Sequence, residues 1–221
     1  MRWSAALVAP LFALALSSGT GVQAKPPQAV SEIDDPTIKA FKARGLAVVV
    51  SHADCGGGSY SVVNSPDGTS VSVLFDNFAA KGSQAAAGVA RTNCAVRIPL
   101  NLPAGYSLGV FRMDYRGFAH LDPGQVAQLS VDYGVGRKGR GRNFRRGLKG
   151  AFDGDFSFFE NIGAGLMKRA GCGEDAALNL AATLDLRSNG GSPEAIVTLD
   201  SIDGSASGGV SFYVDLKKCR P

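Results

Sequence analysis

Histidine, tryptophan and charge are all scarce in this sequence. Two histidines and one tryptophan occur in 221 residues, and charged residues make up 19 % of the chain. Two histidines are few for a metal centre or for acid–base catalysis, so no metal and no other cofactor is predicted. The formal net charge is mild, at +4.

Long apolar runs are also lacking, apart from one at the N-terminus. Arg2 precedes the apolar stretch Ala5 to Leu16, and Val22-Gln23-Ala24 then offers small residues where a signal peptidase reads them. We therefore predict a signal peptide over residues 1–24 and a secreted or periplasmic protein, with no transmembrane segment after cleavage. The apolar stretch is too short to span a bilayer, and an uncleaved anchor is the alternative.

Residues 25–45 are predicted to form a polar leader that ends in one short helix. Asp35 and Pro36 have the residue types of a helix N-cap and first helical position, and Gly45 has that of a helix end. The secreted domain is expected to cover residues 46–221 as one unit.

Closely spaced cysteines are absent too, which argues against a zinc site. The four cysteines lie far apart, and an even number in an exported chain indicates two disulfides. More than one pairing is possible. We favour Cys55–Cys94 and Cys172–Cys219, because each bond closes one half of the chain on itself.

Glycine, by contrast, is abundant at 29 residues, and apolar residues recur with a period of two in the stretches 94–102, 178–186 and 210–216. A hairpin is predicted around the turn Ser65-Pro66-Asp67-Gly68, and a long loop over residues 78–91. About nine strands with short turns predict an all-β fold, an antiparallel β-sandwich.

The stretch from Tyr106 to Leu121 is the longest run of strand-forming residues, and we expect it in the middle of a sheet. Its alternation changes phase, because Leu108 and Val110 follow one phase and Met113 and Tyr115 the other. This change predicts either a strand that is covered on both faces or a bulge near Val110.

Two motif matches near this stretch are interpreted as accidental. Residues 105–109 match the Gly-x-Ser-x-Gly nucleophile elbow, but that motif needs a helix after the serine and a strand-like run follows here. An extended chain would also separate Ser107 from His120 by roughly 40 Å. Residues 134–139 match Gly-x-Gly-x-x-Gly, but no helix pattern follows, so no dinucleotide is expected.

The segment that overlaps this glycine motif is strongly basic. It has seven positive charges in thirteen residues and no acid: Arg137, Lys138, Arg140, Arg142, Arg145, Arg146 and Lys149. We predict a mobile basic loop between two strands. Two interpretations remain open: contact with an anionic polymer or cell surface, for which arginine is suited, and an ordinary solvated hairpin loop.

Polar residues in and around the central stretch form a second candidate site, namely Asp76, Asp114, Arg116, His120 and Asp122. His120 and Asp122, like His52 and Asp54, are spaced to share one face of a strand, although ordinary surface histidines are the expectation. The aspartate-rich segments 153–155 and 200–204 lack the full ligand series of a calcium loop, so turns are expected there.

Several short motifs occur in a distinctive order. They are Cys55-Gly-Gly-Gly-Ser, Ser65-Pro-Asp-Gly-Thr, Phe75-Asp-Asn-Phe78, Asn93-Cys94, Asp114-Tyr-Arg-Gly-Phe118, Cys172-Gly173 and Lys218-Cys219. In this order they resemble a family of secreted proteins known as domain of unknown function 4360, over about residues 48–219. The resemblance implies an exported, disulfide-bearing, β-rich domain and offers no catalytic residues.

Together these observations favour a non-enzymatic exported β-sandwich protein of unknown role that binds an anionic surface or polymer through the basic segment. The alternative is a hydrolase that acts outside the cytoplasm on cell-wall or polysaccharide material. That activity requires two acids, or an acid and a histidine, to converge in a pocket. Its candidates are Asp76, Asp114, His120 and Asp122.

Overall fold

The computed structural model describes residues 52–55, 59–85, 88–136, 141–163, 166–173, 176–188, 194–199 and 208–220. The predicted signal peptide (1–24), the leader with its helix (25–45) and the turn at 200–204 lie outside these residues. All the described residues belong to one unit, Asp34–Pro221.

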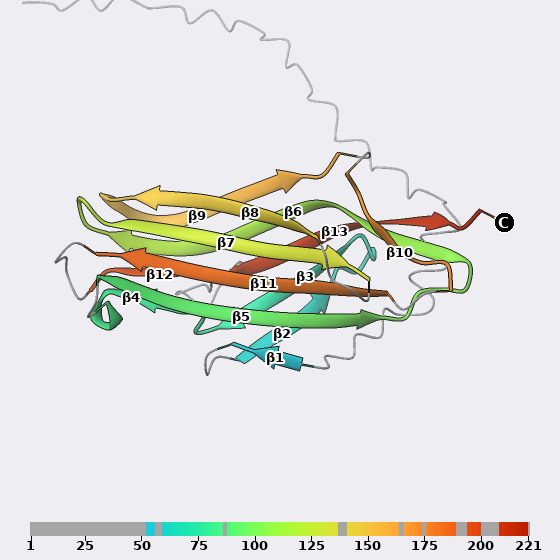
Figure 1. Cartoon of the computed structure of the whole chain (residues 1–221), viewed down its shortest axis with the longest axis horizontal. Helices are drawn as coiled ribbons and strands as arrows, with labels where there is room; N and C mark the ends of the chain where they lie inside the picture. Colours follow the sequence, from blue (N-terminus) through green and yellow to red (C-terminus); the bar gives the residue numbers. More distant parts are fainter. Residues whose placement is uncertain are drawn as a thin grey trace, which may run out of the picture. The chain divides into compact units, whose positions relative to one another are not determined.

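The described chain forms thirteen strands in two antiparallel sheets (Figure 1). The five-stranded sheet has the order β1-β5-β11-β7-β8, and the eight-stranded sheet has the path β2-β3-β13-β6-β12-β4, with β9 and β10 also paired to β6. The strands are β1 (His52–Asp54), β2 (Ser59–Asn64), β3 (Ser70–Asp76), β4 (Ala79–Lys81), β5 (Val89–Leu100), β6 (Tyr106–Leu121), β7 (Val126–Val135), β8 (Arg142–Lys149), β9 (Phe152–Asn161), β10 (Arg169–Gly171), β11 (Ala176–Arg187), β12 (Ile196–Thr198) and β13 (Gly209–Lys218).

The core lies between the inner faces of the two sheets, as the period-two pattern predicts. Ile98 and Leu178 of the five-stranded sheet and Val73 and Phe212 of the eight-stranded sheet are completely buried. Burial of each such side chain stabilises the fold by roughly 2 kcal/mol. The predicted antiparallel β-sandwich is therefore confirmed.

Strand β6 is the centre of the eight-stranded sheet and pairs with four strands. One of its edges pairs first with β13 and then with β12, and the other pairs first with β10 and then with β9. Gly117 lies where β13 gives way to β12, and a Cβ atom there would collide with the carbonyl oxygen of Thr198. A glycine at this position therefore lets β12 come close.

The change of phase in β6 has the predicted cause. Tyr213 of β13 pairs with Arg112 and Val214 pairs with Val110, so Phe111 is the extra residue of a β-bulge. Residues 107–110 are all buried as well, so this part of the strand is also covered on both faces.

Each sheet contains one disulfide, in the pairing favoured from the sequence. Cys55, just after β1, is bonded to Cys94 of β5 in the five-stranded sheet. Cys172 and Cys219, which follow β10 and β13, are bonded at the end of the eight-stranded sheet.

Two predictions of local structure were wrong. Residues 78–91 are not one loop, because they contain β4, a 3₁₀ turn at Gly82–Gln84 and the start of β5. Arg142–Lys149 is not a loop either but strand β8, which pairs with β7 along its whole length. The structure has more strands than the expected nine. The additional strands are short or lie at a charged sheet edge, so their apolar alternation is too brief or too polar to be recognised in the sequence. No helix among the described residues is long and apolar enough to cross a membrane.

Candidate functional site

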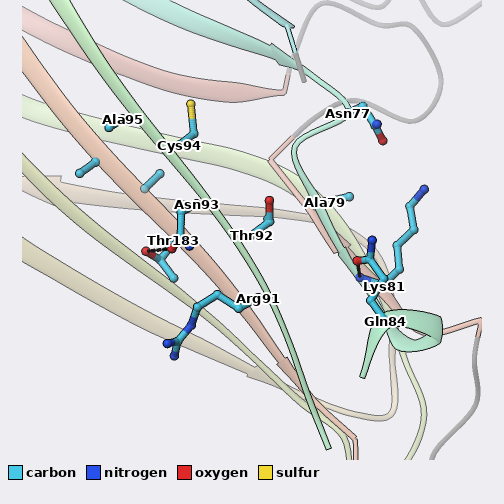
Figure 2. A pocket seen from close by; sticks show the side chains of 12 residues that line it. Asn77, Ala79, Lys81, Gln84, Arg91, Thr92, Asn93, Cys94, Ala95 and Thr183 are labelled. Atoms are coloured by element: carbon cyan, nitrogen blue, oxygen red, sulfur yellow. Dashed lines mark hydrogen bonds between the residues drawn. The ribbon is translucent and has the colours of Figure 1, made fainter. Parts of the chain in front are cut away.

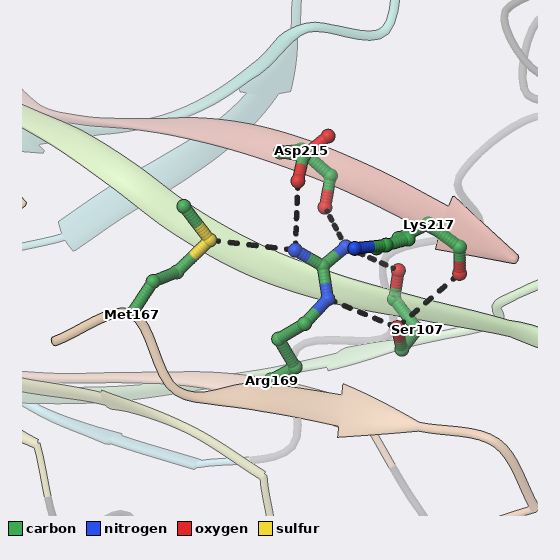
Figure 3. A network of polar contacts seen from close by, with 5 residues as sticks. All are labelled: Ser107, Met167, Arg169, Asp215 and Lys217. Atoms are coloured by element: carbon green, nitrogen blue, oxygen red, sulfur yellow. Dashed lines mark hydrogen bonds and ion pairs between the residues drawn. The ribbon is translucent and has the colours of Figure 1, made fainter. Parts of the chain in front are cut away.

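The serine of the Gly-x-Ser-x-Gly match lies inside β6 and already has partners (Figure 3). Ser107 is 7 % exposed; its hydroxyl donates to the Lys217 carbonyl at 3.2 Å and accepts from Arg169 Nε at 3.0 Å. Arg169 also bonds Asp215 Oδ2 at 2.7 Å and two backbone carbonyls, so its guanidinium fastens β10 to β6 and β13. A serine held in this way has no adjacent base, which agrees with its interpretation as an accidental match.

The predicted polar site is not assembled into one cluster. Asp114 is buried and forms a bidentate pair with Arg112, at 2.6 and 3.0 Å. His120 Nδ1 lies 3.1 Å from the Asp153 carboxylate, not beside Asp122, and both partners are substantially exposed. Six residues of extended strand, roughly 20 Å, separate Asp114 from His120.

The remaining predicted polar residues belong to neither of these two pairs. Arg116 is exposed on β6, and Asp76 ends β3. The backbone N–H of Asp122 donates to Gln125 in the turn before β7. Within the part of the chain that the structure describes, no three His, Cys, Asp or Glu side chains are placed to hold a metal ion.

The two largest clefts found among the described residues open elsewhere on the sandwich. The larger, of about 710 Å³, has Asn77, Lys81 and Gln84 on one side and Arg91, Asn93 and Thr183 on the other (Figure 2). Some of its polar groups already have partners: Arg91 pairs with Asp185, outside the lining, and Thr183 donates to Asn93 at 2.8 Å. The second, of about 620 Å³, lies beside the disulfide of Cys172 and is lined by Arg97, 99–106, Gly171–Gly173 and Ala176. Neither is lined by the predicted acids or by His120.

A cluster of two tyrosines and a glutamate lies between the sheets near β8 and β9. Glu160 accepts hydrogen bonds from Tyr133 at 2.8 Å and from Arg142 at 3.0 Å. Burial, and then the hydrogen bond to Glu160, raise the pKa of Tyr133 far above its usual range. Burial likewise raises the pKa of Tyr115, whose hydroxyl has no hydrogen-bond partner in the described structure. This cluster joins the two sheets, and Tyr133 and Arg142 also line a small cavity of about 40 Å³.

The described part of the basic segment, Arg142–Lys149, forms a strand, and three of its cations are exposed. Phe144 faces the core and is 3 % exposed, which explains why β8 pairs with β7 despite its charges. Arg145, Arg146 and Lys149 are exposed, and no ion pair joins them to an acid among the described residues. The other predicted members differ: Arg142 is paired with Glu160, and Arg137, Lys138 and Arg140 lie outside the described residues.

The sheet register adds a cation that sequence reasoning missed. Val126 of β7 is the direct neighbour of Lys149 on β8 and of Arg187 on β11. Arg187 is exposed, so these two cations lie on the same outer face, two strand spacings or roughly 10 Å apart. Arg145 shares this face with Lys149, so we call Arg145, Lys149 and Arg187 the basic surface. Arg146 lies on the other side of β8, over the ring of the buried Phe144, and is not part of it. Only the pairing of β11 with β7 reveals its last member.

Comparisons with known proteins identify the family. The family described as "Domain of unknown function (DUF4360)" matches residues 48–219, so the chain belongs to this family. A protein of Arthroderma benhamiae named "Uncharacterized secreted protein" is 29 % identical over 166 residues, which cover 74 % of this chain and 67 % of that protein. The predicted localisation, secreted or periplasmic, is thereby confirmed.

One solved structure resembles the chain weakly. It is TmCBM61 in complex with beta-1,4-galactotriose, at 12 % identity, with 76 % of this chain and 87 % of that chain covered and a TM-score of 0.23. A TM-score this low supports no inference about this protein.

Proposed function

We propose that this member of the DUF4360 family is an exported, non-enzymatic protein that binds an anionic polymer through the basic surface. Residues 46–221 form the exported domain in this proposal. The observation that carries it is the set of exposed cations on β8 and β11, for which the described residues supply no acidic partner.

The layout of these cations suits a long ligand. Arg145 and Lys149 are four residues apart on the same side of β8, roughly 13 Å along the strand. Arg187 extends the positive charge across the sheet. Two acids of the same face have partners of their own: Asp185 forms an ion pair with Arg91, and Asp132 accepts a hydrogen bond from Asn143 at 2.8 Å. Repeated negative charges on one polymer could therefore contact several cations at once.

A polymer fits this face better than a membrane does. Membrane-surface proteins combine positive charge with apolar side chains that enter the lipid. Of the large apolar side chains that are exposed in the described structure, Val89 is the one from the five-stranded sheet. The basic surface therefore offers charge without an apolar anchor.

A purely structural role of the charges is the main competing explanation. Strand β8 is at the end of the five-stranded sheet, and natural proteins place lysine and arginine on such edges to prevent pairing with other chains. That role predicts that removal of the charges causes self-association. Our proposal predicts a loss of ligand binding by a protein that remains monomeric.

The test compares two variants with the same change in net charge. In R145S/R146S/K149S the three exposed cations of β8 are removed, and in the control K168S/K217S/K218S three exposed lysines away from this face are removed. Binding to dextran sulfate is measured at about 50 mM and about 300 mM NaCl, with uncharged dextran as the reference ligand.

The wild type and the control should bind dextran sulfate, more weakly at the higher salt concentration, and the β8 variant should bind about tenfold more weakly or worse. Equal affinities of the two variants would contradict the proposal. Self-association of the β8 variant with unchanged binding would support the edge-protection role instead.

The hydrolase alternative has no comparable support. Ser107 is bound to Arg169, Asp114 to Arg112, and His120 to a surface aspartate. The candidate acids do not share either cleft.

A further inference from the structure

The outer face of the eight-stranded sheet exposes aromatic rings. Phe159 on β9 is 58 % exposed and Phe111 on β6 is 39 % exposed. Tyr213 of β13, on the other side of β6 from Phe159, lies directly opposite Arg112. We call Phe111, Arg112, Phe159 and Tyr213 the ring surface. It comprises residues of three neighbouring strands.

The bulge in β6 creates this surface. In a regular strand, successive side chains point to opposite faces, so Phe111 would point away from Arg112 and toward the core. Because Phe111 is the extra residue of the bulge, its ring instead lies beside that of Tyr213, with 6.3 Å between the ring centroids. Bulges often direct a side chain toward a site in this way.

The guanidinium of Arg112 lies between two of the rings. Its central carbon is 5.2 Å from the centroid of the Phe159 ring and 5.3 Å from that of the Tyr213 ring. Both contacts are at cation–π distance, so the planar groups are held together in a row across β13, β6 and β9.

Asp114 makes this row rigid and nearly neutral. It binds Arg112 through two hydrogen bonds, and burial together with the charge and hydrogen bond of Asp114 raises the pKa of Tyr213. The Arg112 charge is thereby compensated, and the Tyr213 ring stays neutral. A free anion would find little net positive charge at this pair, whereas an uncharged ligand would meet a preorganised surface.

Hydroxyl and amide groups surround the rings. The register places Ser211 beside Asp114, and Ser72 beside Ser211, with their hydroxyl oxygens 2.9 Å apart. On the next row, Asn161 is the neighbour of Arg112 and is exposed. The surface thus combines aromatic faces with short polar side chains on neighbouring strands.

We propose that the ring surface binds a sugar residue of a neutral polysaccharide. A pyranose ring has one face of C–H groups, polarised by the neighbouring oxygens, and a rim of hydroxyls. The C–H face complements the electron-rich face of an aromatic ring, and the hydroxyls complement the serine, amide and guanidinium groups. This inference is independent of the basic surface, which belongs to the other sheet.

The test uses native gels that contain hydroxyethylcellulose, soluble starch or galactomannan as neutral probes. The variants F159A and F111A each remove one exposed ring, and V89A removes an exposed apolar side chain from the other sheet as the control. Because these side chains are largely exposed, all three variants should fold.

At least one of the three polysaccharides should retard the wild type and V89A. F159A should lose about tenfold or more in affinity, and F111A should also lose affinity. R145S/R146S/K149S should be retarded like the wild type, which separates this result from the proposed anion binding. Absence of retardation by all three probes, or equal retardation of F159A and the wild type, would overturn the proposal.

Discussion

The two outer faces of the sandwich contain the same ion pair in different surroundings. Arg91 binds Asp185 through Nε and Nη2 at 2.5 and 2.9 Å, and Arg112 binds Asp114 in the same way at 2.6 and 3.0 Å. In both pairs the carboxylate is buried and the arginine is partly exposed. The first pair joins two strands, whereas the second lies along β6 alone.

The neighbours of the two arginines decide what each face offers. Arg91 lies beside Thr92, Asn93 and Thr183 in a polar cleft, on the sheet that also presents the basic surface. Arg112 lies between two aromatic rings on the sheet that presents the ring surface. The same ion-pair geometry thus occurs on a hydrophilic face of one sheet and on an aromatic face of the other. We expect the two faces to recognise different ligands.

The largest effect is expected from removal of the disulfides, which shows whether the stability of the two sheets depends equally on them. The bonded cysteines are separated by 39 residues in the five-stranded sheet and by 47 in the eight-stranded sheet. Loops of such similar length predict that C55A/C94A and C172A/C219A each lower the free energy of unfolding by about 4 kcal/mol. Urea denaturation of the two double variants measures this. A much larger loss in one variant would show that the sheets are not equivalent.

A smaller effect distinguishes the tyrosines that the two sheets contribute to the core. Y133F removes the hydrogen bond to Glu160 and should lower the free energy of unfolding by about 2 kcal/mol. Y115F removes a buried hydroxyl that has no partner in the described structure, so it should raise the free energy of unfolding by about 1 kcal/mol. In both thermal and urea denaturation, the two variants should therefore change the free energy of unfolding in opposite directions. Destabilisation by Y115F would indicate a hydrogen bond to that hydroxyl.

The two ion pairs themselves can be compared with a substitution that keeps the charge. Lysine cannot form the planar bidentate contact in either pair. At Arg112 it also loses the planar stacking against Phe159 and Tyr213. R112K should therefore lower Tm more than R91K, and it should also weaken binding of a neutral polysaccharide. Equal changes in Tm would mean that the rings contribute nothing to holding Arg112.

The smallest effect concerns the turn between β2 and β3. Hydrogen bonds from the Ser65 hydroxyl and the Thr69 N–H lower the pKa of Asp67 below its ordinary value of 3.8. Because the folded-state pKa is the lower one, the stabilisation is complete above the ordinary value and is lost as the pH falls through the lowered pKa. D67N should therefore remove part of the decrease in stability between about pH 5 and about pH 2. Urea midpoints at both ends of this range measure it, and an unchanged decrease would contradict the assignment.

Much of the sandwich could be predicted because a strand with one buried face has apolar residues at every second position of its sequence. Alternation from Leu178 to Leu186 gives β11 directly, and the change of phase near Val110 gives the bulge. Strand β8 could not be found in this way, because Phe144 and Leu148 are its only apolar residues and the pairing with β7 outweighs its charges. The basic residues could therefore be identified from the sequence, but their strand was mistaken for a loop.

The candidate surfaces were harder to predict, because they depend on which strands are neighbours. Arg187 joins the basic surface only through the register of β11 and β7. Phe159 and Tyr213 reach Arg112 from β9, which begins 31 residues after β6 ends (121 to 152), and from β13, which lies much nearer the C-terminus. The sequence does contain Arg112, but nothing local distinguishes it from any other arginine. Cross-strand pairing is the missing information.

The salt dependence of binding to dextran sulfate tests the account most directly, with wild type, R145S/R146S/K149S and F159A measured side by side. A plot of log Kd against log salt concentration reports how many counterions are released on binding. We predict a steep slope for the wild type, the same slope for F159A and a clearly smaller slope for the β8 variant. Equal slopes for all three proteins would contradict the assignment of anion binding to the basic surface.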